Sequence, residues 1–176
     1  MHHVKLIAAC LIAASPVAAL AQTDLASKIV NDPGAPEIKG ARATLVDDEK
    51  VQGGKAIRVA VPKKGANNWD SVVESSVSKP VKKGDKLVLA FEARLEKGPD
   101  GATSAAIPYS AIQLKAAPHT GVVQGQVTVG PDWQFHRIEG TADKDYPADA
   151  LKATIQVGNA RQTIDFGPVV VLNMGQ

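Results

Sequence analysis

Residues 87–96, LVLAFEARLE, carry the clearest strand pattern in the sequence. Apolar side chains occupy every second position: Leu87, Leu89, Phe91, Ala93 and Leu95. Charged side chains fall between them towards the end of the stretch: Glu92, Arg94 and Glu96. A period of two is that of a β-strand with one face in a core and the other towards solvent. The stretch therefore predicts a strand whose leucine face is buried.

Similar strands are predicted on both sides of this stretch. Apolar residues occupy every second position from 57 to 61 within 55–61, and from 151 to 157. The segment 163–172 is apolar almost throughout, which is typical of a buried central strand. Turn residues such as those at 98–101 separate the segments at intervals of about 8 to 12 residues. About nine strands without a helical period predict an all-β protein, either an antiparallel β-sandwich or a barrel.

Two of these strands carry more specific expectations. Pro108 lies within a predicted strand and indicates an edge position or a β-bulge, because proline cannot donate a ladder hydrogen bond. In a later strand, Trp133 and Phe135 alternate with Gln134 and His136. We expect the two aromatic side chains to face the core.

The composition limits the classes of function. The chain has 176 residues with 20 Lys and Arg against 18 Asp and Glu, a formal net charge of +2. A scatter of both signs argues against a nucleic-acid partner, which requires a clustered basic surface. The length suits a single domain and excludes a large multidomain enzyme.

Residues 1–21 have the order of a secretory signal peptide. A basic start precedes an apolar stretch over 6–14, and small residues end at Ala21, near which we expect cleavage. The apolar stretch is too short to span a bilayer, so no membrane partner is expected. We predict export to the periplasm or the extracellular space. The exported part would comprise an irregular lead-in over 22–40 and a sandwich domain over 41–176.

Common catalytic motifs are missing from the sequence. No His-Glu-x-x-His, Gly-x-Ser-x-Gly or phosphate-binding glycine loop occurs, and the only cysteine, Cys10, lies in the predicted signal peptide. A Ser-His-Asp set stays open, with His119 and His136 as the candidate bases. A glycoside hydrolase would need two carboxylates at a fixed separation, and Glu74 and Glu92 are the candidates for its acid and base.

Five landmarks follow one another from about residue 50 to the end: GGKAIRV at 53–59, Trp69 in a polar loop, VKKGDK at 81–86 before the long strand, WQFHR at 133–137 and TIDFGPV at 163–169. In this order they resemble the carbohydrate-binding modules of the family four, nine and twenty-two group. The resemblance implies a β-sandwich with jelly-roll topology. It also implies a groove that binds a soluble polysaccharide or oligosaccharide chain without cleaving it.

The resemblance has two further implications. Asp165 matches a ligand of the structural calcium ion of the group. Modules of the group usually occur attached to a glycoside hydrolase, so a chain without one would work beside a glycan-degrading enzyme acting in trans.

Sugar recognition combines an aromatic ring against the C–H face of a pyranose with planar polar groups that bond adjacent hydroxyls. Trp69 lies among polar neighbours and is predicted to be an exposed platform. If Phe91, Phe135 and Ile155 face the core, period two places their polar neighbours on the outer faces. The predicted ligand-binding residues are Trp69, Glu74, Glu92, Arg94, Tyr109, Gln113, His136 and Gln156.

Two other functions stay open at the level of the sequence. One is a small jelly-roll enzyme, a glycoside hydrolase or lyase that uses Glu74 and Glu92. The other is a structural or protein-binding sandwich, in which the outward polar residues form an ordinary solvated surface.

Overall fold

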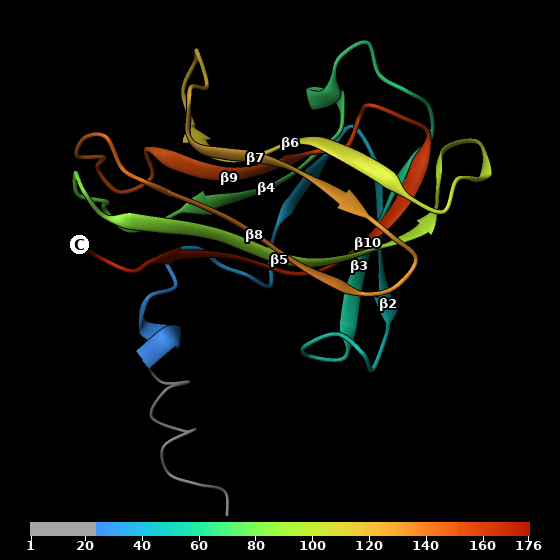
Figure 1. The fold of residues 1–176 in the computed structure, drawn as a ribbon, viewed down its shortest axis with the longest axis horizontal. Helices are drawn as coiled ribbons and strands as arrows, with labels where there is room; N and C mark the ends of the chain where they lie inside the picture. The colour runs from blue at the N-terminus through green and yellow to red at the C-terminus, as the bar shows by residue number, and fades with distance from the viewer. Residues whose placement is uncertain (1–23) are drawn as a thin grey trace, which may run out of the picture.

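Ten β-strands build the part of the protein that the structure describes, residues 24–176 of a computed structural model (Figure 1). In chain order they are β1 (Glu37–Lys39), β2 (Arg42–Asp47), β3 (Lys55–Val61), β4 (Val72–Val77), β5 (Lys86–Lys97), β6 (Ala105–Leu114), β7 (Gly121–Val129), β8 (Gln134–Thr141), β9 (Leu151–Gln156) and β10 (Gln162–Asn173). Two short 3-10 turns are η1 (Asn68–Asp70) and η2 (Pro99–Gly101). The predicted signal peptide lies outside the described residues. Within residues 24–176, no helix is long and apolar enough to cross a membrane.

The strands form two five-stranded antiparallel sheets that lie face to face (Figure 1). Their orders are β1-β4-β9-β6-β7 and β2-β3-β10-β5-β8. Among the described strands, consecutive ones pair only in the β2–β3 and β6–β7 hairpins, and every other connection crosses to the opposite sheet. The predicted antiparallel jelly-roll sandwich is confirmed. The central position predicted for 163–172 is also confirmed, because β10 lies between β3 and β5.

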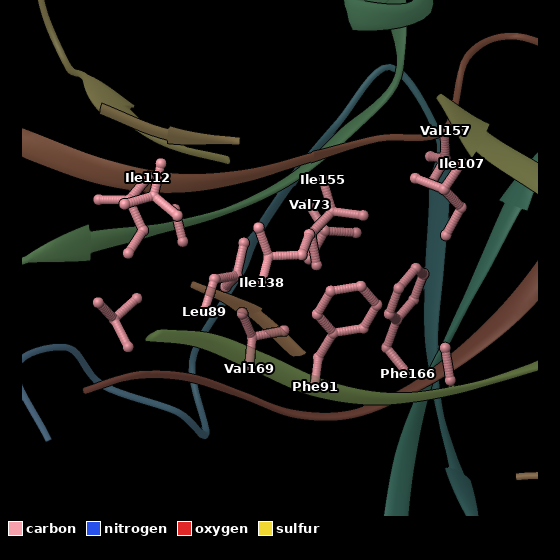
Figure 2. Packing of buried hydrophobic residues seen from close by; sticks show 14 of the residues in the cluster. Val73, Leu89, Phe91, Ile107, Ile112, Ile138, Ile155, Val157, Phe166 and Val169 are labelled. Carbon is pink, nitrogen blue, oxygen red and sulfur yellow. The ribbon is translucent and has the colours of Figure 1, made fainter. Parts of the chain in front are cut away.

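The hydrophobic core fills the space between the sheets (Figure 2). The predicted inward face of β5 is confirmed, since all of its members are buried: Leu87, Leu89, Phe91, Ala93 and Leu95. Phe91 meets Phe166 of β10 with 6.1 Å between the ring centroids, and Figure 2 shows Val73 and Ile155 of the other sheet above Phe91. Burial of each large apolar side chain contributes about 1.5–3 kcal/mol. Core burial thus decides which face of each strand points outward.

Strand pairing changes two local predictions. The lead-in over 22–40, expected to be irregular, contains β1, which pairs with β4 in a register that places Glu37 opposite Glu74. Three residues are too few for a sequence pattern to be recognised. Pro108 marks a bulge rather than an edge, because β6 lies between β9 and β7 and its register to β7 shifts at this point.

The phase of β8 is opposite to the prediction. Phe135 is 66% exposed, whereas His136 faces the core, where its ring centroid lies 5.3 Å from that of Phe91. Ile138 explains the difference, because it is buried on the same face as His136 and pairs with Leu89 of β5. Both faces of this strand carry apolar side chains, so alternation alone does not distinguish them.

Candidate ligand-binding groove

Three rows of side chains lie on the outer face of the sheet β1-β4-β9-β6-β7, because paired residues of adjacent strands share a face. The first row is Lys39, Val72, Gln156 and Tyr109. The second row is Glu37, Glu74, Thr154, Ala111 and Gln124. The third row is Ser76, Lys152, Gln113 and Gly121. The register thus brings together polar residues from all five strands of the sheet.

A groove in two connected parts covers these rows. One part, of about 640 Å³, has aromatic, hydroxyl and amide side chains in its lining: Trp69, Tyr109, Gln113, Thr154 and Gln156. The other, of about 800 Å³, has no Trp, Tyr or Phe among the described residues that line it. Four residues line both parts: Lys39, Glu74, His119 and Lys152. The connection that carries η1 and the β6–β7 connection rise above this face of the sandwich (Figure 1).

Trp69 stands at the groove on a loop with little room to move. Its side chain is 62% exposed, and the turn that carries it is closed by a hydrogen bond from Asn67 N to Asp70 Oδ2 at 3.0 Å. Two glycines let the backbone of this loop pack closely: a Cβ at Gly40 would lie 1.7 Å from Asp70 O, and one at Gly158 would lie 2.7 Å from Asn68 O. The backbone that carries the indole is therefore closely packed, and it presents an exposed aromatic side chain at the groove.

Tyr109 extends from β6 across to β7. A Cβ placed on Gly121 would lie 2.8 Å from the Tyr109 hydroxyl, so the glycine leaves the space that this side chain occupies. Burial raises the pKa of Tyr109, and the hydroxyl is therefore a protonated donor at neutral pH. Gln113, buried beneath the groove, and Gln156, half-buried, add amide groups that both donate and accept.

Glu74 lies on the floor of the groove between two lysines. Its Oε2 accepts a hydrogen bond from Lys39 Nζ at 2.9 Å, and its Oε1 accepts one from Lys152 Nζ at 2.5 Å. Burial alone would raise the pKa of Glu74, but the hydrogen bonds from Lys152 and Lys39 outweigh it and hold the pKa below its usual value. Glu74 is therefore a carboxylate at neutral pH, which is unsuitable for a general acid.

The predicted ligand-binding residues do not include three residues that line the groove, Lys39, His119 and Lys152. Lys39 lies in the short β1, where no pattern was recognised. Lys152 shares the outward face of β9 with Thr154 and Gln156, since the three are every second residue of the strand. This spacing was the signal that could have identified Lys152. His119, named above only as a candidate base, is exposed in the β6–β7 connection, and the fold places it against the groove.

The structure does not bring Glu92, Arg94 and His136 into this groove. They belong to the other sheet, where Glu92 and Arg94 are on its outer face and His136 faces the core. The strand faces were predicted without the knowledge of which sheet each strand joins. Glu74 and Glu92 consequently lie on opposite sides of the sandwich, and they do not flank a common glycosidic bond as an acid and base must.

Arg94 is part of an ionic network on that opposite face. Trp133, predicted to lie in the core, is instead half-buried here, with its ring centroid 5.2 Å from the Arg94 guanidinium carbon. The indole Nε1 donates to Asp48 Oδ2 at 3.1 Å, and Arg94 Nη1 lies 3.0 Å from the same oxygen. The contacts tie the β2–β3 connection to the sheet.

Asp165 does not fit the calcium site that the resemblance implies. Its buried carboxylate accepts hydrogen bonds from Arg58 at Oδ1 and Oδ2, and from Arg94 at Oδ2, at 2.8–3.0 Å. Calcium requires six to eight oxygen ligands, whereas two guanidinium groups surround this carboxylate. Within residues 24–176, no group of three or more His, Cys, Asp or Glu could hold a metal ion.

Solved structures share this architecture at low sequence identity. One described as CBM4 has a TM-score of 0.61 and 16% identity, covering 80% of this chain and 96% of its own. The fold is that of the CBM4 and CBM22 carbohydrate-binding modules. This finding confirms the fold implied by the resemblance.

Two further structures have the same fold. The second N-terminal cellulose-binding domain of β-1,4-glucanase C from Cellulomonas fimi has a TM-score of 0.60 and 15% identity, covering 83% of this chain and 92% of that domain. The CBM22-1 and GH10 modules of Clostridium thermocellum xylanase 10B, complexed with xylohexaose, give a TM-score of 0.58 and 14% identity over 82% of this chain and 28% of the other. No protein-family model and no curated protein matches the sequence.

Proposed function

We propose that this chain is an exported, non-catalytic carbohydrate-binding protein that holds a polysaccharide or oligosaccharide chain in the groove of the β1-β4-β9-β6-β7 sheet. The observation that carries the proposal is the exposed indole of Trp69 beside Tyr109 and the amides of Gln113 and Gln156. An aromatic face packs against the C–H face of a pyranose, and amides bond adjacent hydroxyl groups. The groove supplies both kinds of contact on one face of the sheet.

The solved structures of the same fold support this class of ligand. One is named a cellulose-binding domain, and another holds xylohexaose. The groove is open along the sheet rather than closed into a deep cavity, which suits part of a chain better than a single free sugar.

The arrangement of carboxylates supports a binding role without cleavage. Glu74 is ion-paired with two lysines, and Glu92 is on the opposite face of the sandwich. Degradation of the bound glycan would then be the work of a separate enzyme acting in trans. The signal-peptide pattern of residues 1–21 supports export of this chain to the periplasm or the extracellular space, where such an enzyme would meet it.

Binding of soluble oligosaccharides tests the proposal. Titration calorimetry with cellohexaose, xylohexaose and acidic oligosaccharides should give saturable binding of at least one chain. Trp69→Ala should weaken this binding by about tenfold or more, because a stacking platform is lost. Phe135→Ala is the matched control: Phe135 is exposed to a similar extent, 66% against 62%, but lies on the other sheet, so its removal should leave the affinity unchanged. No binding by any glycan, or equal losses in both variants, would contradict the proposal.

A further inference from the structure

Lys152 has hydrogen-bonding capacity that the protein does not use. Its side chain is only 15% exposed, and among the described residues Glu74 is its only carboxylate partner. An ammonium group has three N–H donors, of which Glu74 takes one. Lys152 lines both parts of the groove, so its two remaining N–H donors are available to a bound ligand.

The aromatic part of the groove has an excess of positive charge. The Lys, Arg, Asp and Glu residues that line it are Lys39, Lys152 and Glu74. Glu37 also lies 3.2 Å from Lys39 Nζ, but it lines only the other part, and its side chain is 67% exposed. Water and salt screen such exposed charges, and Lys39 is itself 54% exposed, so the least screened cation of the groove is Lys152. A sugar that lies against Trp69 therefore passes beside the little-exposed pair of Lys152 and Glu74 and the more exposed Lys39.

A carboxylate on the ligand would complete this arrangement. Charge-assisted hydrogen bonds are about twice as strong as those between neutral groups. A sugar hydroxyl can also accept from an ammonium group, but it leaves the positive charge unbalanced in a partly desolvated site. We infer, resting on the proposed function, that the bound chain contains uronic acid units. The sugar ring lies on the aromatic part, and its carboxylate accepts hydrogen bonds from Lys152 and Lys39.

Pairs of oligosaccharides that differ only in the carboxylate test this inference. Suitable probes are β-1,4-linked oligomannuronate, oligogalacturonate and glucuronoxylan oligosaccharides, each with its carboxyl-reduced counterpart. Calorimetric titration of the purified protein should show at least one uronate chain binding about tenfold or more tightly than its reduced form. The preference should shrink as ionic strength rises.

Lysine variants assign the preference to the groove. Lys152→Gln should abolish the preference for the uronate chain, whereas Lys152→Arg should retain it, and thermal unfolding establishes that each variant is folded. Lys55→Gln is the matched control, because Lys55 also pairs with a carboxylate, that of Asp47, but on the other sheet. Equal binding of uronate and reduced chains would overturn the inference and leave the proposed function standing. If neither acidic nor neutral chains bind, both fall.

Discussion

Arg58 binds Asp165 through two parallel hydrogen bonds, from Nε to Oδ1 at 2.8 Å and from Nη2 to Oδ2 at 2.9 Å. Arg94 donates to Oδ2 as well, so one fully buried carboxylate binds two guanidinium groups on the face opposite the groove, where Glu96 and Asp48 supply further negative charge. In Asp165→Asn, the two cations lose their one fully buried anion and keep only the more exposed Glu96 and the carboxylate of Asp48. We expect the free energy of unfolding, measured by urea denaturation, to fall by about 3 kcal/mol.

The exposed pair of Asp47 and Lys55 provides the control for this change. Asp47→Asn should lower the free energy of unfolding by less than about 1 kcal/mol, because water screens the exposed charges. Similar losses in the two variants would show that the buried bonds of Asp165 to the two arginines stabilise the fold no more than an exposed ion pair does.

The hydrogen bonds of Asp165 also lead to a prediction about calcium. Because its oxygens are bonded to Arg58 and Arg94, the fold should not depend on an ion at Asp165. Thermal unfolding in excess chelator should give the same midpoint as unfolding in millimolar calcium. A midpoint that drops with chelator and is restored by calcium would indicate a calcium site in this protein.

Gly121 controls the position of Tyr109. A methyl group at Gly121 would lie 2.8 Å from the Tyr109 hydroxyl and 2.5 Å from Gln124 Oε1, so Gly121→Ala must displace both side chains. We expect weaker glycan binding, by about threefold to tenfold, with a loss of stability below about 1 kcal/mol, because flexible side-chain ends can move. Gly130→Ala is the control, since its nearest new contact, with Gln134, is an ordinary 3.7 Å. Unchanged affinity in Gly121→Ala would exclude Tyr109 as a ligand contact.

His136 should make stability depend on pH. Burial lowers its pKa, and its Nε2 has no hydrogen-bond partner among the described residues. The unfolded state, with an ordinary histidine pKa of about 6.5, therefore takes up a proton before the folded state does. The contribution of neutral His136 to stability is complete above the unfolded-state pKa. It is lost as the pH falls from there towards the lower pKa of His136 in the folded protein.

Unfolding midpoints measured between about pH 5 and about pH 8 check this dependence. His136→Leu should flatten the acid side of the profile, while His119→Gln, in an exposed loop, should follow the wild type. A wild-type profile that stays flat over this range would contradict the buried, neutral state of His136.

Most strands of this fold, though not the three-residue β1, could be predicted from local pattern. Leu87 to Leu95 show one face of β5 without knowledge of any other strand, since burial imposes the period of two. The outward direction of Gln156 and the exposure of Trp69 follow from equally local information. These features are encoded within a few neighbouring residues.

The sequence pattern does not contain the long-range pairing that completes the site. Lys39 meets Glu74 only because β1 adds to the edge of β4, and Lys152 reaches the same carboxylate from β9. The bonds from Arg58 and Arg94 to Asp165 similarly join three strands. Alternation fixes the face of a residue, whereas strand order and register fix its neighbours. The misassigned phase of β8 arose in the same way, because a partner strand decides between two acceptable faces.

The close packing of the Trp69 loop against Gly40 and Gly158 has a kinetic consequence. The backbone of this loop is already packed, so it needs no ordering step when a ligand arrives. Binding therefore costs little backbone conformational entropy in the protein. Association should therefore be a single phase whose rate rises in proportion to ligand concentration, limited by diffusion and orientation rather than by loop closure. Differences in affinity among glycans would then appear mainly as differences in how quickly each one leaves.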